Sequence, residues 1–594
     1  MKKNTVDNLK TLIRAGRGVI PATTVIQNGK LVNVMTNEVY PADIAIYEDT
    51  IVAVGDVKDY IDEKTEIIDA TDRYLCPGLI DGHIHSECSK LSITSYSKAV
   101  VPHGTTSMIS GLDEYISVSG LEGLKEVLKE ADASPLKVFW GAPYKTPYTF
   151  PKSTVSFNFT PEVHKEVQQW NECNGVWEVV REAVMEEDPD TLGAIAYAHE
   201  NRLPIFGCAP MARGKDLNGY LCSGVRLDHE SYSHEEVIEK MRNGMHMLMR
   251  ESTITRFMEE NIRAVTEVNP SLARRVSFCT DDVTATGVIE EGHLDRVVRM
   301  AIRAGVAPIT AIQMATINSA EAYRLDDKIG SITPGKMADI LFIEDLTQFH
   351  VRSVMVEGTV VAEDYSLNYK LEAPERSEVL VGKLKCELTT KSDFEYRVDI
   401  ENGTADVLSM DVKAPFVRKR KDATLNVVNH IVMPDIEQDV AMVSVIERFG
   451  RNGNKSLAFC SGWKLKSGAM ASSAAPDDNN LVVMGTSAED MMVAANYLIE
   501  NGGGQVVVNH GKVVDFLPLP VGGIVSDLEP TDVMEREIQL KDASRALGCT
   551  LPEPLMYMFF LPITAIPDYA ITDVGPVDCV NLTTFDPILK LNAK

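Results

Sequence analysis

The hydrophobic positions near the start of the chain follow the pattern of short β-strands. Between Thr24 and Gly55, runs of β-branched residues are separated by turn residues. The pair Asn28-Gly29, which lies between the first two runs, is typical of a β-hairpin turn. The sequence therefore predicts a small β-structure with strands at 25–27, 31–34 and 43–46.

A similar pattern returns far downstream, at 338–343 and 354–361. The two β-rich segments bracket about 250 residues, which is the usual length of a (β/α)8 barrel. Within that length, apolar strand-like runs alternate with amphipathic helical runs such as His234–Met241. Because strands that alternate with helices indicate a parallel sheet, we predict an α/β fold: a (β/α)8 TIM barrel with a split small β-sandwich domain.

Beyond a polar connector at 370–377, the chain continues as a second α/β region. Strand candidates lie at 425–428, 481–483 and 506–508, with a turn at Gly502-Gly503-Gly504. The predicted domains are a composite β-domain from 1–77 and 325–368, a barrel at 78–324 and a C-terminal α/β domain at 378–594. The C-terminal domain is expected to shield the barrel mouth or to join subunits.

The composition is that of an ordinary globular protein, with 44% hydrophobic and 24% charged residues. A formal net charge of -28 disfavours a nucleic-acid partner, which would need clustered lysine and arginine. The one basic cluster, Arg418 to Lys421, is short and is expected to be a solvated turn.

The spacing of the cysteines, the first residues and the length of the apolar runs indicate where in the cell the protein is located. Ten sparse and irregularly spaced cysteines favour a reducing cytoplasm over a disulfide scaffold. Met1-Lys2-Lys3-Asn4 leads into polar residues rather than into the apolar core of a signal peptide. No run reaches the roughly 20 apolar residues that span a bilayer. We therefore expect a cytoplasmic protein without a membrane partner.

The strongest chemical motif is Cys76-Pro77-Gly78-Leu79-Ile80-Asp81-Gly82-His83-Ile84-His85. Side chains at positions i and i+2 of a strand point to the same face, so both imidazoles can meet one metal ion. A lone His-x-His pair is weak evidence, because core and surface histidines are common. Here the pair lies at the predicted C-terminal end of the first barrel strand, where barrel enzymes have their active sites. The position favours a metal centre that includes His83 and His85.

Several collinear motifs give the chain a resemblance, over nearly its whole length, to the bacterial adenine deaminases of the amidohydrolase superfamily. In the barrel region they are Val101-Pro102-His103-Gly104-Thr105-Thr106, Asp228-His229-Glu230 and Thr280-Asp281-Asp282. In the C-terminal region they are Gly468-Ala469-Met470-Ala471-Ser472-Ser473 and Leu517-Pro518-Leu519-Pro520. The resemblance implies a homo-oligomeric hydrolase that converts adenine and water to hypoxanthine and ammonia.

The resemblance also implies a site for one or two divalent ions, for which zinc, iron and manganese are all suited. His83 and His85 match the family's first-strand pair, His229 its sixth-strand histidine and Asp281 its eighth-strand aspartate. Glu172 falls where the family places a metal-bridging glutamate, although a surface residue is an equal alternative. In such a site the metal activates water for attack on C6 of the purine, and Asp281 takes up the proton.

Further acidic residues are candidates for catalysis or for substrate binding. Glu230 directly follows His229, and Glu87 lies two residues after His85, so that either can supply an acid or contact the substrate. Structural salt bridges are the alternative role for both. Asp113, Glu114 and Asp282 complete the candidates for substrate binding.

Four positions depart from the family pattern, because each has lost a histidine. Cys208 replaces the expected fifth-strand ligand, and the other positions are Asp113, Pro476 and Asn479. A thiolate is a competent zinc ligand, so Cys208 is a candidate metal ligand, with an inert buried thiol as the alternative. The losses leave two hypotheses: a deaminase with an altered metal site, or a relative that opens a cyclic amide or acts on another purine-like ring. The retained ligands favour an enzyme over a binding protein.

Overall fold

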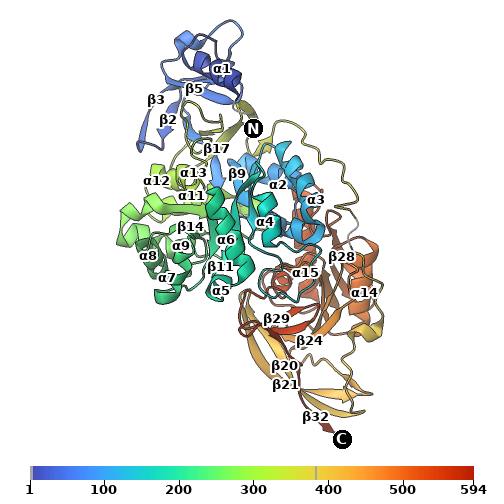
Figure 1. The fold of residues 1–594 in the computed structure, drawn as a ribbon. Coiled ribbons are helices and arrows are strands. Elements are labelled where there is room, and N and C mark those ends of the chain that lie inside the picture. The colour runs from blue at the N-terminus through green and yellow to red at the C-terminus, as the bar shows by residue number, and fades with distance from the viewer. Residues whose placement is uncertain (1–4, 382–383) are drawn as a thin grey trace.

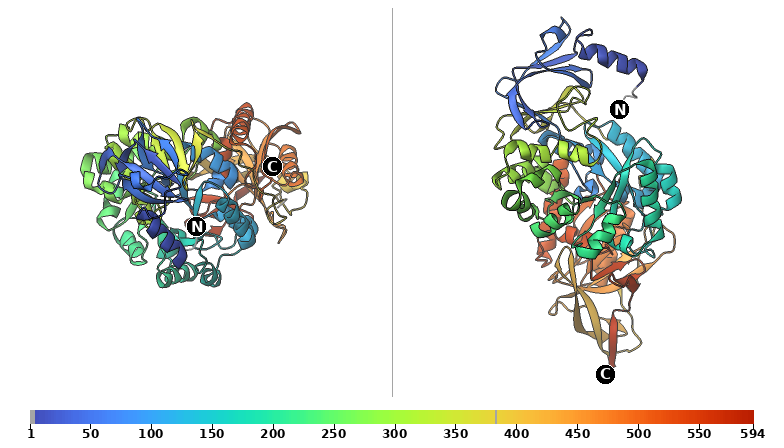
Figure 2. Two further views of the ribbon diagram at one scale, coloured as in Figure 1. Left: turned by 90° about the horizontal axis from the view of Figure 1, so that it is seen from above. Right: turned by 60° about the vertical axis from the view of Figure 1, so that its left-hand side comes forward.

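The molecule is elongated, with three parts in a row (Figure 1). The computed structural model describes residues 5–381 and 384–594. A β-domain lies at one end, a barrel in the middle and an α/β domain at the other end, as the turned view in Figure 2 also shows. Met1 to Asn4, on which the expectation about a signal peptide rests, lie outside the described residues. Among the described residues, no helix has the length and apolarity needed to cross a membrane.

The β-domain joins chain from before the barrel to chain from after it. A four-stranded sheet, covered by helix α1 (Val6–Gly16), has the order β5-β4-β1-β6. A seven-stranded sheet has the order β19-β18-β17-β16-β7-β2-β3, in which β7 pairs antiparallel with β16. The strands are β1 (Thr24–Gln27), β2 (Lys30–Asn33), β3 (Glu38–Pro41), β4 (Asp43–Tyr47), β5 (Thr50–Gly55), β6 (Glu66–Asp69), β7 (Tyr74–Pro77), β16 (Ile340–Ile343), β17 (Val351–Val356), β18 (Thr359–Glu363) and β19 (Ser366–Leu367).

The turn at Asn28-Gly29 is not the predicted hairpin turn. Strand β1 pairs with β4 and β6, whereas β2 pairs with β3 and β7, so the two strands belong to different sheets. Asn28 has a φ of 65°, and a Cβ added to Gly29 would lie 2.5 Å from Cδ1 of Leu75. The turn therefore carries the chain from one sheet to the other, a role for which the same residue types are needed as for a hairpin.

The central part is a barrel of eight parallel strands, as the sequence predicted. In chain order they are β8 (Leu79–Asp81), β9 (Thr105–Ser110), β10 (Lys137–Pro143), β11 (Cys173–Val180), β12 (Ile205–Cys208), β13 (Leu227–Asp228), β14 (His246–Arg250) and β15 (Val276–Cys279). The barrel closes between its first and last strands, where Ile84 pairs in parallel with Asp281. The Asp281 N–H donates to the His83 carbonyl at 3.0 Å, so closure itself brings two predicted site residues together.

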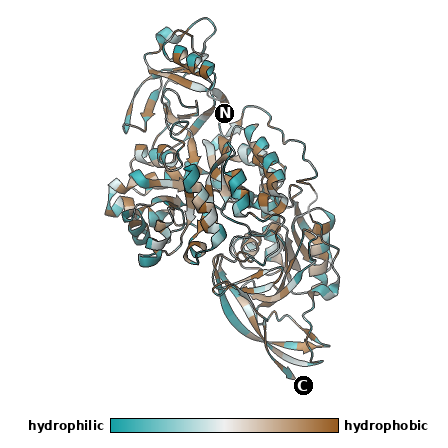
Figure 3. Ribbon diagram, viewed as in Figure 1, coloured by the Kyte–Doolittle hydropathy of each residue, from teal (hydrophilic) through white to brown (hydrophobic). Residues whose placement is uncertain are grey.

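Helices surround the barrel, and they carry both polar and apolar residues, as Figure 3 shows. The predicted helix at 234–241 is α8 (His234–Arg242), whose first turn is capped by the Ser233 hydroxyl. The other helices of this part are α2 (Ile93–Val100), α3 (Asp113–Asp132), α4 (Pro161–Val167), α5 (Arg181–Met185), α6 (Pro189–Asn201), α7 (Gly214–Cys222), α9 (Met258–Asn261), α10 (Ala285–Glu291), α11 (Leu294–Arg303), α12 (Pro308–Met314) and α13 (Ile317–Ala322).

The C-terminal domain is a mixed sheet of ten strands with helices packed against it. The sheet order is β22-β21-β20-β24-β23-β26-β25-β27-β28, with β32 paired to β20. The three strands predicted here fall within β21, β26 and β27, and the connector at 370–377 contains no helix or strand. The elements are β20 (Gly403–Ala414), β21 (Val417–Val428), β22 (Ile431–Val432), β23 (Val440–Ile446), β24 (Lys455–Ser461), β25 (Ala469–Ser472), β26 (Leu481–Gly485), α14 (Ala488–Glu500), β27 (Gly504–Asn509), β28 (Lys512–Pro518), α15 (Pro530–Ala546), α16 (Pro554–Phe559), β29 (Tyr569–Thr572), β30 (Gly575–Asp578), β31 (Thr583–Thr584) and β32 (Ile588–Ala593).

The basic cluster that begins at Arg418 lies in strand β21, so the prediction of a solvated turn is wrong. Arg418 is 1% exposed. Its guanidinium donates hydrogen bonds of 2.5 to 3.0 Å to four backbone carbonyls, those of Phe560, Leu561, Ile563 and Ile566. These carbonyls replace water as the hydrogen-bond partners of the guanidinium. They belong to a segment far along the chain, so the sequence around Arg418 does not indicate them.

Candidate metal centre and its cavity

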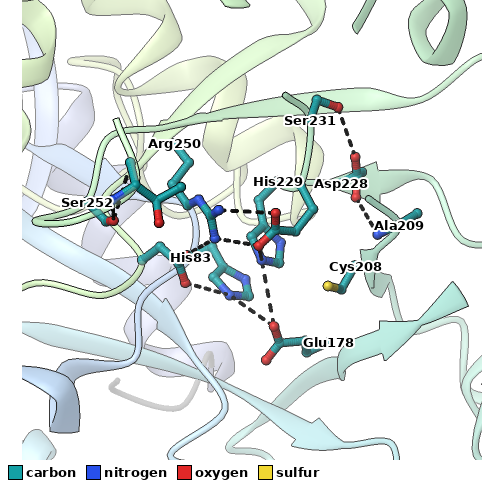
Figure 4. Close-up of polar contacts among 12 residues, drawn as sticks. His83, Glu178, Cys208, Ala209, Asp228, His229, Ser231, Arg250 and Ser252 are labelled. Atoms are coloured by element: carbon teal, nitrogen blue, oxygen red, sulfur yellow. Dashed lines mark hydrogen bonds and ion pairs between the residues drawn. The ribbon is translucent and has the colours of Figure 1, made fainter. Parts of the chain in front are cut away.

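Side chains that can bind a metal gather at the C-terminal ends of the barrel strands (Figure 4). His83 and His85 follow β8, and Glu178 lies near the end of β11. Cys208 is the last residue of β12. The set is completed by His229, directly after β13, and by Asp281, shortly after β15. The barrel fold thus brings six residues from separate segments of the chain together in one cluster.

The Glu178 carboxylate lies at the centre of this cluster. Its Oε2 is 3.2 Å from Nε2 of His85, and its Oε1 is 3.7 Å from Nε2 of His229. On the other side, Oδ1 of Asp281 is 3.6 Å from Nε2 of His83 and 3.8 Å from Nε2 of His85. Its two oxygens therefore face different histidines, and Glu178 belongs to more than one group of candidate metal ligands.

The backbone turns both carboxylates into the site. Glu178 has a φ of 50° and Asp281 a φ of 57°. Both lie in the left-handed region of backbone conformation, which residues other than glycine rarely adopt. At Glu178 the pairing between β11 and β12 is irregular, because the register shifts between Val176 and Val179. Such bulges redirect side chains and are common beside active sites.

Neighbouring groups orient the imidazoles. Nδ1 of His229 donates a hydrogen bond of 3.1 Å to the carbonyl of Gly207, which leaves Nε2 free to bind a metal. The His83 ring lies between the rings of His229 and Trp177, with centroids 3.7 and 4.1 Å away. Nε2 of His83 is buried and has no hydrogen-bond partner among the described residues.

These donors fit a divalent metal ion. In three overlapping groups all ligand atoms lie within 4.8 Å of one another: His83, His85 and Glu178; His83, His229 and Asp281; and Glu178, Cys208 and His229. Imidazole, carboxylate and thiolate are the ligand types that zinc and similar ions prefer. A buried imidazole nitrogen without a protein partner also fits a metal ligand, since buried polar atoms nearly always have a partner.

A buried arginine sets the charge around Asp281. Arg250, which ends β14, is 2% exposed and binds Glu230 and Asp281 through its Nη1. Its Nη2 makes a second contact with Glu230, at 3.1 Å. Burial opposes ionisation of Asp281, but the charges of Arg250 and of the nearby histidines hold its pKa below the usual range. For Asp282 burial dominates, and the neighbouring Asp281 adds to it, so its pKa rises to about 7.

The C-terminal domain roofs this centre and encloses a cavity of about 570 Å³. The barrel supplies the polar floor, including Glu178 and Arg250, while the roof is largely apolar. Phe416 packs over the guanidinium of Arg250, with 5.6 Å between Cζ and the ring centroid. The other roof residues include Pro476, Asp477, Phe560, Ile563 and Ile566. Both domains therefore form the cavity, and the C-terminal domain shields the barrel mouth.

The structure brings most of the predicted site residues together, with Glu87 as an exception. Besides the clustered ligands, the cavity is lined by Asp113, Glu114, Glu230 and Asp282. Glu87 does not line it. Glu87 is 2% exposed within a short 3-10 helix at Ser86–Ser89, and it accepts a hydrogen bond from the Ser86 hydroxyl at 3.1 Å. Its burial raises the pKa of its carboxyl to about 7.

Glu172 is not at the centre, and this expectation is corrected. It is exposed and lies in the turn before β11, at the end of that strand opposite to the site. Glu178, which sequence reasoning missed, lies with the histidines of the cluster instead. The signal that could have identified it is its place late in the apolar run Val176–Val180, because barrel sites lie at the C-terminal ends of strands.

The positions that depart from the family's histidines meet in this region. Oδ1 of Asp113 is 3.4 Å from Nδ1 of His85. Asn479, from the C-terminal domain, donates a hydrogen bond to the carboxylate of Glu114. Pro476 lines the cavity, and Cys208 belongs to the cluster. The four changes therefore alter one place in the molecule rather than four unrelated ones.

Comparisons with known proteins agree with this architecture. The model of the amidohydrolase family matches residues 74–361, which include the barrel and the strands that follow it. The model of the adenine deaminase C-terminal domain matches residues 416–583. The two matches together include every residue of the cluster and most of the roof.

Similarity to curated proteins extends over the whole chain. An "Adenine deaminase 1" of Desulfotalea psychrophila is 73% identical over 99% of both chains. An "Adenine deaminase 1" of Latilactobacillus sakei is 55% identical over 98% of both, and an "Adenine deaminase" of Moorella thermoacetica is 36% identical over 98% of both. The chain therefore belongs to the adenine deaminase family of the amidohydrolases.

Proposed function

We propose that this protein is a metal-dependent adenine deaminase, which converts adenine and water to hypoxanthine and ammonia. The observation that carries the proposal is the Glu178 carboxylate, which lies between the histidines at the floor of the cavity under the C-terminal domain. Relatives that are 55% to 73% identical to this chain are named adenine deaminase, which supports the same substrate here.

The cavity suits a small flat heterocycle. Its volume of about 570 Å³ lies within the range of pockets that bind small molecules. Apolar roof residues such as Phe416 and Ile563 can cover the ring faces, while carboxylates and Arg250 on the floor can hydrogen-bond to the ring edge. Enclosure by the C-terminal domain limits the water around the reacting atoms, which strengthens these polar contacts.

His83, His85, Glu178, His229 and Asp281 would hold the ion or ions. When bound, a divalent metal supplies a Lewis acid that activates water near neutral pH. Asp281 accepts one proton of the attacking water as its oxygen bonds to C6, and it returns this proton to the amino nitrogen as the C6–N bond breaks and ammonia leaves. The second water proton passes from the new C6 hydroxyl to ring nitrogen N1, which gives hypoxanthine. Arg250 fixes the Asp281 carboxylate in place through Oδ2, so that Oδ1 faces the histidines.

The remaining acidic residues are assigned by their positions. Glu230 and Asp282 line the cavity beside Asp281, and we propose that they contact the purine ring. Asp113 and Glu114 line the cavity near His85, where they complete the substrate contacts. Glu87 has no place on the cavity wall, so we assign it no contact with the substrate.

The test is an ammonia-release assay on protein of measured metal content. Adenine, other aminopurines and cyclic amides are compared, and hypoxanthine is identified as the product of adenine. The Asp281→Asn variant should keep the fold and lose turnover by several orders of magnitude, since it cannot accept the proton. Ring opening of a cyclic amide without ammonia release, and no turnover of adenine, would overturn the proposal.

A further inference from the structure

Strand β12 ends in a cysteine that faces the metal-binding cluster. We propose that the Cys208 thiolate is a ligand of the bound ion, so that this centre combines sulfur with imidazole and carboxylate and favours zinc-like ions over manganese. The inference rests on the proposed function only in requiring that the cluster hold a metal.

The first support is the position of the sulfur. The Cys208 Sγ, a carboxylate oxygen of Glu178 and a ring nitrogen of His229 all lie within 4.8 Å of one another. In Figure 4 the sulfur lies on the same side of the strand ends as Glu178 and His229. An ion at the centre of these three atoms would be within bonding reach after small side-chain movements, because bonds from zinc to sulfur are about 2.3 Å long.

The backbone holds Cys208 in register with its partners. The Gly207 carbonyl accepts the hydrogen bond from His229 that aims its Nε2 into the site, and Cys208 is the next residue. The Cys208 N–H donates to the Tyr220 hydroxyl at 3.1 Å, and that hydroxyl donates to the carbonyl of Val179 at 2.5 Å. The same contacts therefore fix Cys208, His229 and the strand that carries Glu178 relative to one another.

An inert thiol is the alternative, and burial together with the charges of Glu230 and Glu178 raises the pKa of the Cys208 thiol. Within residues 5–381 and 384–594, no hydrogen bond from the Cys208 Sγ is found, whereas the nearby Cys88 Sγ donates to Asp282 at 3.0 Å. Cys208 lines the polar floor of the cavity, at the edge of the hydrophobic core against which it packs. A sulfur without a partner, among carboxylates and an imidazole, matches the ligand set of a borderline-soft cation.

Cobalt reports on sulfur ligation directly. The full-length protein is loaded with Co²⁺, and its absorption is compared with that of equally loaded Cys208→Ser, Cys208→His and Cys222→Ser variants. We expect a near-ultraviolet sulfur-to-cobalt charge-transfer band in the wild type and in Cys222→Ser, because Cys222 is an exposed residue at the end of α7. The band should be absent from Cys208→His, which retains a ligand at this position and bound cobalt. An equal band in all four proteins would overturn the proposal.

Alkylation gives a second readout that does not depend on turnover. Metal-free and zinc-loaded protein are treated with iodoacetamide, and labelled cysteines are mapped by mass spectrometry. Zinc should protect Cys208 by at least about 10-fold, while the exposed Cys222 is labelled equally in both samples. Equal labelling of Cys208 with and without zinc, at full zinc content, would contradict the proposal.

The two proposals fail in distinguishable ways. A sulfur-to-cobalt band in a protein that does not deaminate adenine would support the thiolate ligand and refute the proposed substrate. Adenine deamination without the band, at full cobalt content, would refute the thiolate ligand and support the proposed substrate. Competition between zinc and manganese adds a quantitative arm: the preference for zinc should fall by about 10-fold or more in Cys208→His, since imidazole is a harder ligand than thiolate.

Discussion

At the scale of single residues, two carboxylates carry strained backbone. Glu178 and Asp281 are both in the left-handed region, where each residue costs on the order of 1 kcal/mol. At Glu178 the conformation accompanies a register shift, beyond which β11 and β12 pair regularly again. Asp281 lies after the end of β15, where it pairs with Ile84 at the closure of the barrel. The strain at Glu178 therefore serves the site, whereas the conformation of Asp281 serves both the site and the barrel.

Glu178→Gln is predicted to lose metal and activity together. An amide cannot supply two anionic oxygens, so metal content at low free zinc should fall and kcat/KM should drop by about 100-fold or more. Metal analysis and steady-state kinetics measure the two effects. Glu172→Gln is the matched control, because Glu172 is exposed at the other end of β11. Loss of metal in the control, with Glu178→Gln unaffected, would return the bridging role to Glu172.

Asp478 gives a prediction about pH and stability. It is 3% exposed, and burial, together with the nearby charge of Asp573, raises the pKa of its carboxyl to about 7. The folded state therefore retains a proton that the unfolded chain releases near its ordinary pKa of about 4. The stabilisation is complete below about pH 4 and is lost as the pH rises through about 7.

Asp478→Asn should remove this dependence. Between about pH 5 and about pH 8, the free energy of unfolding should fall by on the order of 3 kcal/mol more in the wild type than in the variant. The Tm of the variant should therefore fall less than that of the wild type over this range. Asp345→Asn serves as the control, because Asp345 is exposed and hydrogen bonds to Thr347 and Gln348 keep its pKa below this window. Parallel Tm profiles for the wild type and Asp478→Asn would show that Asp478 ionises freely in the fold.

At the scale of elements, strand β21 and the segment after α16 depend on one another. Arg418 donates to the carbonyls of Phe560, Leu561, Ile563 and Ile566. The first two also accept from the N–H groups of Ile563 and Ile571, whereas Arg418 is the only donor found for the last two among the described residues. Phe560, Ile563 and Ile566 line the cavity roof. The hydrogen bonds from Arg418 thus hold this irregular segment in place as part of the cavity roof.

Arg418→Met is predicted to loosen the roof. The carbonyls of Ile563 and Ile566 would lose their donor, and a buried carbonyl without a donor costs about 1 to 3 kcal/mol. Tm should therefore fall, and KM for adenine should rise several-fold with metal content unchanged. Arg420→Met is the control, since Arg420 is exposed and its ion pair with Asp422 contributes little. Similar losses of Tm in both variants would mean that the strand's charge, not the buried hydrogen bonds, matters.

How much of the site could be predicted depends on the element that carries each residue. His83 and His85 were predicted from a His-x-His pair at the expected end of the first barrel strand, and His229 and Asp281 from their resemblance to the family's motifs. Glu178 was missed because the bulge in β11 conceals where the strand ends. The roof contacts could not be predicted, because they join segments whose separation along the chain is set only by the tertiary fold.

At the scale of the whole molecule, the eight strands form a closed barrel, and the C-terminal domain covers the cavity at its mouth. The sequence pattern was sufficient for the barrel, since repeated strand and helix signals require the parallel arrangement. The domain boundaries, the homo-oligomer and the cytoplasmic location stay predictions. Many polar contacts join the barrel to the C-terminal domain, among them those of Ser526 with Lys90 and Ser92. Arg376 in the connector adds a charged contact to them.

Arg376 links all three segments at this contact. Its guanidinium binds Glu130 of helix α3, with one contact of 3.0 Å, and Asp527 of the C-terminal domain at 2.6 and 3.2 Å. The Glu130 side chain is only 1% exposed, whereas that of Asp527 is 28% exposed. Without the arginine, Glu130 would be a buried charge with no compensating cation, which typically costs about 3 to 5 kcal/mol.

Arg376→Met should therefore lower Tm and expose the connector at 370–377 to proteases. Adding Glu130→Gln to this variant should restore part of the lost stability, because it removes the uncompensated charge that the single change leaves behind. The exposed pair of Arg545 and Asp542 gives the control, in which Arg545→Met changes Tm little. If Glu130→Gln instead adds a further loss to Arg376→Met, the arginine stabilises this contact through packing rather than through charge.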